Sequence, residues 1–191
     1  EKWPEISAQL SHTKDGGYRE VNYHDMFQNA MDFSGALIEF GVKRGDIIGL
    51  IADNREEWEQ ADVGILSIGA IDTPRGCDAT ESDLSYILSF SEVQICITEN
   101  EAQVKKLLKI KKNVPTLNTI VAFDAVSDEI KEKCAEEGIS CLQFRDLLSR
   151  GHEWRKVHPD VVEQELEKGK IDDLATIIFT SGTTGTPKGV M

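Results

Sequence analysis

The residues best suited to chemistry lie in one segment near the carboxyl end of the 191-residue chain. The segment reads Thr180-Ser181-Gly182-Thr183-Thr184-Gly185-Thr186-Pro187-Lys188-Gly189-Val190. Glycines let backbone N–H groups approach an anion closely, and hydroxyl side chains add further donors. Lys188 adds a positive charge of the kind that binds phosphate. This combination predicts a loop that holds a polyphosphate.

The spacing differs from that of the common phosphate-binding loops. The pattern G-x-x-x-x-G-K-[ST], counted from Gly182, would need a glycine where Pro187 stands, and G-x-G-x-x-G is not matched either. The alternative interpretation is a polar surface turn rich in glycine and threonine. In that case Lys188 would be an ordinary solvated side chain.

The upstream sequence predicts the elements that must position this loop. Apolar runs bounded by turn residues alternate with segments whose apolar residues recur at helical spacing. We expect strands over 47–52, 93–98, 119–123, 139–142 and 174–180, and helices over 23–40, 53–68, 80–88, 101–112, 127–137, 144–149 and 161–168. This order predicts an α/β fold with a mostly parallel sheet flanked by helices. Ligands collect beyond the carboxyl ends of such strands, which is where the loop after 174–180 would lie.

Local residues indicate where several of these helices begin and end. Asn22 and Thr80 are residue types that favour a helix N-terminus, and Asp53-Asn54 offers a cap for the helix that follows it. Gly41 is placed to end the first helix. No internal repeat or Pro/Gly-rich linker divides the chain, so we expect one domain.

Composition narrows the classes of function. Lys and Arg number 21 against 34 Asp and Glu, a formal balance of −13, which argues against nucleic acid as a partner. No stretch approaches the roughly 20 apolar residues that span a bilayer. The four cysteines form no C-x-x-C pair and the four histidines do not cluster, so we expect reduced thiols, a cytoplasmic location and no metal site in this chain. A disulfide between Cys134 and Cys141 is the alternative for that pair.

Other polar groups are interpreted as structural. Two basic groups are expected to be solvated surface: Lys105, Lys106, Lys109, Lys111 and Lys112, and then Arg150, His152, Arg155, Lys156 and His158. The functional alternative for the lysines is peripheral contact with the inner face of a membrane or with the phosphates of coenzyme A. Asp72, Arg75 and Asp78 are expected in a loop before a helix, with a groove-lining role as the alternative. Trp58 and Tyr86 are expected to pack in the core or against a helix.

At residues 179–190 the sequence resembles the adenylate-forming superfamily, which includes acyl- and aryl-CoA ligases, luciferases and peptide-synthetase adenylation domains. Its signature is Tyr/Phe-Thr-Ser-Gly-Ser/Thr-Thr-Gly-x-Pro-Lys-Gly, and every fixed position matches. Upstream, the segments 41–46, 53–58 and 69–76 are similar to bacterial long-chain acyl-CoA synthetases. Glu56 stands where a proline is usual before Glu57.

The resemblance implies an acid–thiol ligase that uses ATP, Mg²⁺, a fatty acid and coenzyme A in lipid metabolism. The carboxylate attacks the α-phosphate of ATP, and the thiol of coenzyme A then displaces AMP. The residues implied to wrap the β- and γ-phosphates are Thr180, Ser181, Gly182, Thr183, Thr184 and Gly185. Lys188 would supply charge at the mouth of the loop, and Thr184 and Lys188 are the residues implied to act in catalysis.

The resemblance also predicts what the chain lacks. Residues 1–191 correspond to the first lobe of the family's large N-terminal domain, truncated just after the phosphate loop and without the C-terminal lid. The motifs for adenine, magnesium and the acyl group would lie beyond Met191, so we expect this piece by itself to be inactive as a ligase. An aryl-CoA ligase, a peptide-synthetase-type adenylation domain and a non-enzymatic truncated interaction module remain as alternatives.

Overall fold

The computed structural model of the chain describes residues 4–13, 15–180 and 188–191. Five parallel strands form its centre: β3 (Ile47–Ile51), β4 (Ile71–Arg75), β5 (Ile95–Thr98), β6 (Thr119–Ala122) and β7 (Ser140–Gln143). Their order in the sheet is β4-β3-β5-β6-β7. The chain adds β4 on one side of β3 and β5 on the other, so the carboxyl ends of these three strands meet at a topological switch point. This confirms the predicted parallel α/β sheet.

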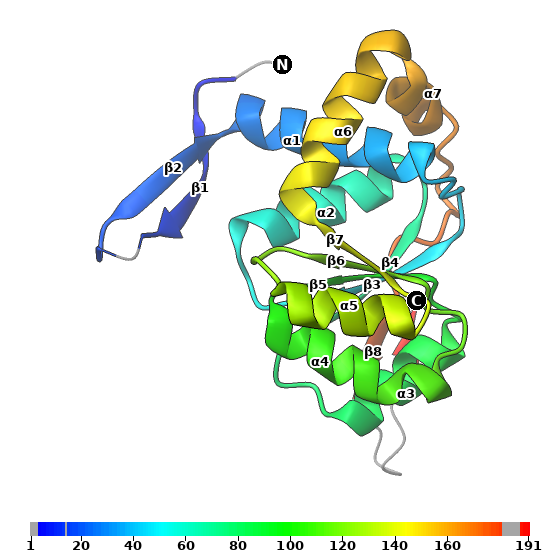
Figure 1. Cartoon of the computed structure of the whole chain (residues 1–191). Coiled ribbons are helices and arrows are strands. Elements are labelled where there is room, and N and C mark those ends of the chain that lie inside the picture. Colours follow the sequence, from blue (N-terminus) through cyan, green and yellow to red (C-terminus); the bar gives the residue numbers. More distant parts are fainter. Residues whose placement is uncertain (1–3, 14, 181–187) are drawn as a thin grey trace.

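Helices cover both faces of the sheet (Figure 1). One face carries α1 (Tyr23–Glu39), α2 (Glu56–Ser67), α6 (Phe144–Val157) and α7 (Val161–Glu167). The other carries α3 (Glu81–Phe90), α4 (Glu101–Ile110), which continues into the 3-10 turn Lys111–Asn113, and α5 (Asp128–Glu136). Among the described residues, no helix combines the length and the apolar character that crossing a bilayer requires.

Two antiparallel hairpins complete the described structure. Strands β1 (Ser7–His12) and β2 (Tyr18–Asn22) project away from the helical layer at the N-terminal end (Figure 1). Strands β8 (Ile178–Thr180) and β9 (Lys188–Val190) pair near the other end of the chain. Neither the first hairpin nor β9 was among the expected elements, because each strand is short and largely exposed and lacks a continuous apolar run.

Capping residues fix the helix starts much as expected. The side chain of Asn22 accepts from the backbone N–H of Asp25 at 2.7 Å, and Thr80 forms a capping box with Asp83. Helix α2 departs from expectation, because it begins after Arg55 and has no side-chain cap. Asp53 is therefore free to bind elsewhere, as described below.

The apolar strand runs are buried on both faces, as predicted. Ile48 and Leu50 pack with α1, α2 and α6, whereas Ile51 packs with α3 and α4 on the opposite face. Gly49 allows the second layer to approach, because a Cβ there would lie 2.9 Å from the sulfur of Cys96 and 3.0 Å from Leu88.

Two boundaries correct the sequence interpretation. Residues 71–75, expected as loop, form β4 at one edge of the five-stranded sheet, where Asp72 and Pro74 break the apolar pattern that identifies a strand. Helix α6, expected over 144–149, continues to Val157. The basic residues from Arg150 to Lys156 therefore lie on its last two turns, and His158 follows its end. Arg155, expected to be solvated, is instead largely buried in an ion pair with Asp32, and Gly151 is buried against α1.

Candidate functional site

The strand that leads into the glycine- and threonine-rich segment extends the sheet beyond β4. Asp72 is the point of attachment: its N–H donates to the carbonyl of Ala175 at 3.2 Å, and its carbonyl accepts from the N–H of Ile177 at 2.9 Å. The pairing at Asp72 and Thr176 is parallel. Strand β8 therefore runs in the same direction as β4, and its carboxyl end lies at the same edge as the switch point.

The β8–β9 hairpin closes the base of the predicted phosphate loop. Thr180 and Lys188 are partners in the antiparallel register, and both are exposed. The structure thus brings together two of the predicted site residues that lie eight positions apart in the chain. The others, Ser181, Gly182, Thr183, Thr184 and Gly185, lie outside the described residues.

The residue before the loop is fixed by contacts on two sides. The carbonyl of Phe179 accepts from Nη1 of Arg75 at 3.1 Å, and the Phe179 ring is buried. Its ring meets those of Tyr86 and Phe90 edge-on, with centroids 6.3 and 6.0 Å away. Tyr86 is partly exposed beside this hairpin and stacks on Phe90 of its own helix, so it fits the helix-packing alternative and not burial in the core.

An open groove of about 730 Å³ adjoins the hairpin at the carboxyl ends of β3 and β4. Its size falls within the usual range for sites that bind small molecules. It is lined by Ala52, Asp53, Asn54, Trp58, Pro74, Arg75, Gly76, Asp78, Ile178 and Phe179. The groove-lining alternative is therefore confirmed for Arg75 and Asp78. Asp72 is buried and does not line the groove.

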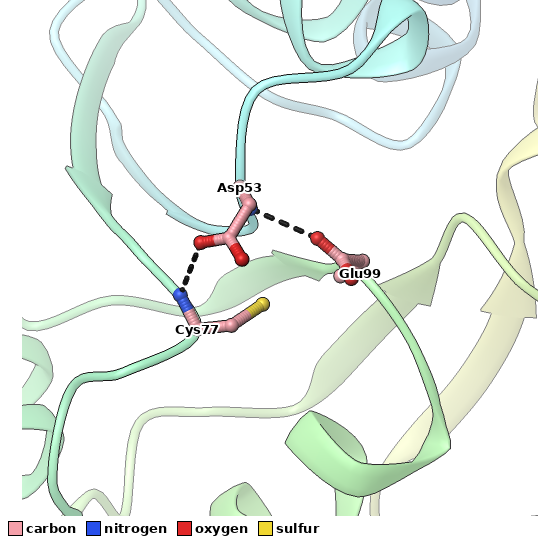
Figure 2. Close-up of side chains that lie close together, drawn as sticks. All are labelled: Asp53, Cys77 and Glu99. Carbon is pink, nitrogen blue, oxygen red and sulfur yellow. Dashed lines mark hydrogen bonds between the residues drawn. The ribbon is translucent and has the colours of Figure 1, made fainter. Parts of the chain in front are cut away.

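Three chemistry-bearing side chains meet at the switch point itself: Asp53, Cys77 and Glu99 (Figure 2). Each offers a ligand-type atom, and these atoms lie within 4.8 Å of one another. Asp53 accepts from the N–H of Cys77 at 2.9 Å, and Glu99 accepts from the N–H of Asp53 at 2.9 Å. The two carboxylates thereby fasten the loops that follow β3, β4 and β5. The shared signal, a polar residue just after each strand, is visible in the sequence.

The Cys77 thiol is kept protonated in this cluster. Burial, with a smaller contribution from the nearby carboxylate of Glu99, raises the pKa of Cys77 to about 11. A protonated thiol is a poor nucleophile and a poor metal ligand. Mg²⁺ requires a nearly octahedral set of oxygen ligands, so this donor set does not suit it.

A second pair of acidic side chains consists of Asp72 on β4 and Asp62 on α2. Asp72 is 1% exposed, and its Oδ1 has no hydrogen-bond donor among the described side chains and backbone. Burial and the facing Asp72 carboxylate raise the pKa of Asp62, on α2, to about 7. The proton that Asp62 retains can be donated to Asp72, which reduces the cost of burying two carboxyl groups.

The lysine-rich helix has structural partners on this side of the sheet. Lys106 donates to the carbonyls of Cys77 and Ala79 at 2.7 and 3.0 Å and so braces the loop after β4. Lys105 pairs with Glu101, and Lys109 pairs with Glu81, both at 2.6 Å. These contacts support the structural interpretation of the lysines.

Known proteins resemble this chain along nearly its whole length. The sequence profile of one family, described as AMP-binding enzyme, matches residues 1–191. The chain is 27% identical to fatty acyl-CoA synthetase A of Dictyostelium discoideum over 97% of this chain and 26% of that protein. It is 29% identical to human long-chain-fatty-acid–CoA ligase 1 over 95% of this chain and 25% of that protein. The chain therefore spans about a quarter of the length of these relatives.

Solved structures share the fold. The adenylation domain of a carboxylate reductase from Mycobacterium chelonae matches with a TM-score of 0.75 at 18% identity, over 96% of this chain and 30% of that one. The anthranilate CoA ligase AuaEII, solved with anthranoyl-AMP, matches with a TM-score of 0.75 at 24% identity, over 98% of this chain and 32% of that one. At these identities the likeness concerns the fold alone.

Proposed function

The chain belongs to the AMP-binding enzyme family, and from that membership we propose that its protein activates a fatty acid with ATP and transfers the acyl group to coenzyme A. Adenylate-forming enzymes use ATP to activate a carboxylate, and the relatives named above are fatty acyl-CoA ligases at about 27% identity. The preference for a long acyl chain is part of the proposal.

We propose that residues 1–191 form the N-terminal part of the adenylation domain and that a longer protein supplies the rest. The support is that the chain covers about a quarter of each relative. The full-length enzyme, meaning this chain extended to the length of those relatives, is therefore the object of the activity tests. We expect the 191-residue chain by itself to have negligible ligase activity.

The observation that supports the site most directly is the pairing of Thr180 with Lys188 at the carboxyl end of the loop-bearing strand. It joins the two ends of a segment with two glycines and several hydroxyl groups, at the edge where α/β sheets bind ligands. We propose that this segment, with Thr184 and Lys188 as the groups that act on the reaction, holds the β- and γ-phosphates of ATP.

In the proposed first step, an oxygen of the fatty acid carboxylate attacks the α-phosphorus and the bond to the bridging oxygen of pyrophosphate breaks. Negative charge then grows on the leaving pyrophosphate. Hydrogen-bond donors of the segment and the Lys188 ammonium would stabilise that charge. Mg²⁺ bound with the ATP phosphates would neutralise part of it, and we assign no residue of the described part of the chain to that ion.

In the proposed second step, the thiolate of coenzyme A attacks the acyl carbon of the acyl-adenylate. The bond to the AMP oxygen breaks, and AMP leaves with the electron pair. The groups that would hold coenzyme A and the acyl chain are not assigned to the described residues. A panel of fatty and aryl acids tested on the full-length enzyme distinguishes a fatty acyl-CoA ligase from an aryl-CoA ligase.

Carboxylate-dependent exchange of labelled pyrophosphate into ATP tests the first step in the full-length enzyme. We expect Lys188→Ala and Thr184→Ala each to lower the exchange rate at least tenfold, because each removes a donor that acts on developing charge. Lys156→Ala is the control, because Lys156 lies on α6 and pairs only with Glu153 among the contacts described. Undiminished exchange in both loop variants would reject the proposed roles of Thr184 and Lys188, and absence of exchange in the parent enzyme would reject the proposed function.

A further inference from the structure

The backbone ladder between β4 and the loop-bearing strand is interrupted at Pro74. In a parallel pair, the N–H and carbonyl groups of alternate residues point to the same neighbouring strand. The N–H and carbonyl of Asp72 bind the backbone of Ala175 and Ile177. The next backbone N–H of β4 that would donate to this strand is therefore that of residue 74. Pro74 has no N–H, and the carbonyl of Ile177 therefore loses its expected backbone partner.

Two side chains of β4 take the place of the missing backbone donors. The hydroxyl of Thr73 donates to the carbonyl of Ile177 at 3.1 Å, and Nη1 of Arg75 donates to the carbonyl of Phe179 at 3.1 Å. Thr73 is completely buried, and Arg75 is half-buried at the rim of the groove. Each of these contacts joins residues that are 104 positions apart.

The two contacts lie immediately before the loop. Phe179 directly precedes Thr180, and Thr180 in turn pairs with Lys188, so a displacement of Phe179 would displace both ends of the loop. An uninterrupted backbone ladder would hold this strand whatever side chains β4 carried. Here, beyond the two backbone hydrogen bonds at Asp72, the hydrogen bonds from β4 to the strand come from one hydroxyl and one guanidinium.

We propose that Thr73 and Arg75 are positioning residues for ATP, which act by holding the carbonyls of Ile177 and Phe179 and thereby set the place of the phosphate loop. This rests on the proposed function. Arg75 also fixes a positive charge beside the start of the loop, while Lys188 provides one at its end. An anion held by the loop would be attracted by both charges.

Paired variants of the full-length enzyme separate this role from a general loss of stability. Thr73→Val removes the hydroxyl at nearly constant side-chain volume, whereas Thr73→Ser retains the hydroxyl. Arg75→Met removes both the hydrogen-bond donor and the charge, whereas Arg75→Lys retains a charged donor. Thr98→Val is the matched control. Thr98 is equally buried, and its hydroxyl donates to the carbonyl of Val121 on the neighbouring strand at 3.4 Å, away from the loop.

We expect the KM for ATP to rise about fivefold in Thr73→Val and about tenfold in Arg75→Met, as for the loss of one neutral and one charged hydrogen bond. The KM for the fatty acid should stay within twofold, and Thr73→Ser and Arg75→Lys should recover most of the change. Thr98→Val should lower the melting temperature about as much as Thr73→Val but leave the KM for ATP unchanged. Arg75 is half-buried, so its variants keep the test decisive if Thr73→Val does not fold.

The proposal is overturned if the KM for ATP is unchanged in both removal variants, or if Thr98→Val raises it equally. It is also overturned if neither conservative variant restores it. If Lys188→Ala abolishes pyrophosphate exchange while the Thr73 and Arg75 variants behave like Thr98→Val, the proposed function stands and only this inference fails. If Lys188→Ala and Thr184→Ala exchange normally, the proposed loop site and this inference both fail, whereas absence of exchange in the parent enzyme is the result that rejects the proposed function.

Discussion

The helical layer of α1, α2 and α6 and the sheet edge of β4, β8 and β9 are held in opposite ways. In the helical layer, added Cβ atoms at Gly35, Gly64 and Gly151 would lie 2.8, 2.8 and 1.7 Å from their nearest neighbours across the helix contacts. At the sheet edge, side-chain hydrogen bonds supplement a short backbone ladder. The helical layer is therefore fixed by steric fit over its whole length, whereas the edge depends on a few polar groups.

A buried ion pair reinforces the steric fit of the helical layer. Asp32 on α1 is 8% exposed and binds Nη1 of Arg155 on α6 at 2.6 Å, with Nδ1 of His152 at 3.2 Å. Ser34 donates to the carbonyl of Gly64 on α2 at 2.9 Å. Neither contact involves a residue that lines the candidate groove, so these two contacts support the helical layer and not the groove.

The largest expected effect is on the helical layer. Gly151→Ala in the 191-residue chain should lower the free energy of unfolding by about 3 kcal/mol, because the new methyl would overlap the carbonyl oxygen of Asp32 and force α1 and α6 apart. Urea denaturation followed by circular dichroism measures this. Ser149→Ala, two residues earlier and exposed, is the control and should change stability by less than about 0.5 kcal/mol. A cost below about 1 kcal/mol for Gly151→Ala would show that this layer is not sterically fixed.

An intermediate effect is expected behind the loop-bearing strand. The folded-state pKa of Asp62, about 7, lies above its ordinary value of 3.8 because of burial and the facing charge of Asp72. The folded chain then binds more protons than the unfolded chain between about pH 4 and pH 7, so stability falls as pH rises through that window. Asp62→Asn keeps a donor toward Asp72 and removes the charge.

Urea denaturation at two pH values measures this effect. Asp62→Asn should be more stable than the parent chain by about 1–2 kcal/mol at pH 8, after discounting for solvent screening, and nearly equal to it at pH 4. Asp172→Asn, at an exposed position, should show no such difference between the two values. If Asp62→Asn and the parent chain are equally stable at pH 8, the acidic pair does not lower the free energy of unfolding.

The smallest effect is expected at the loop after β4. Lys106→Met should lower the free energy of unfolding by about 0.5–1 kcal/mol, because the carbonyls of Cys77 and Ala79 lose their ammonium donor. Lys105→Met, at the preceding position, removes an exposed lysine that pairs with Glu101 on the helix surface and should cost less. If the Lys105 variant proves the more costly, the lysine braces are not what holds this loop.

Most of the frame could be predicted because its signals are local. The run at 47–52 contains only apolar residues and glycine, and Asn22 and Thr80 cap helices through atoms three residues away, so short windows contained the necessary information. Strand β4 was missed for the converse reason. Asp72 and Pro74 are poor strand residues, and β4 forms because its neighbours β3 and the segment 175–177 provide partners.

The sequence by itself determined the alternation of elements and the composition of the phosphate loop, because both depend on residues that are neighbours in the chain. Only the tertiary structure decided that Thr73 and Arg75 hold the strand before that loop, that Asp53, Cys77 and Glu99 meet at the switch point, and that Asp62 faces Asp72. These contacts join residues from 10 to more than 100 positions apart. Their distances are set by the packing of whole strands and helices, which no local pattern encodes.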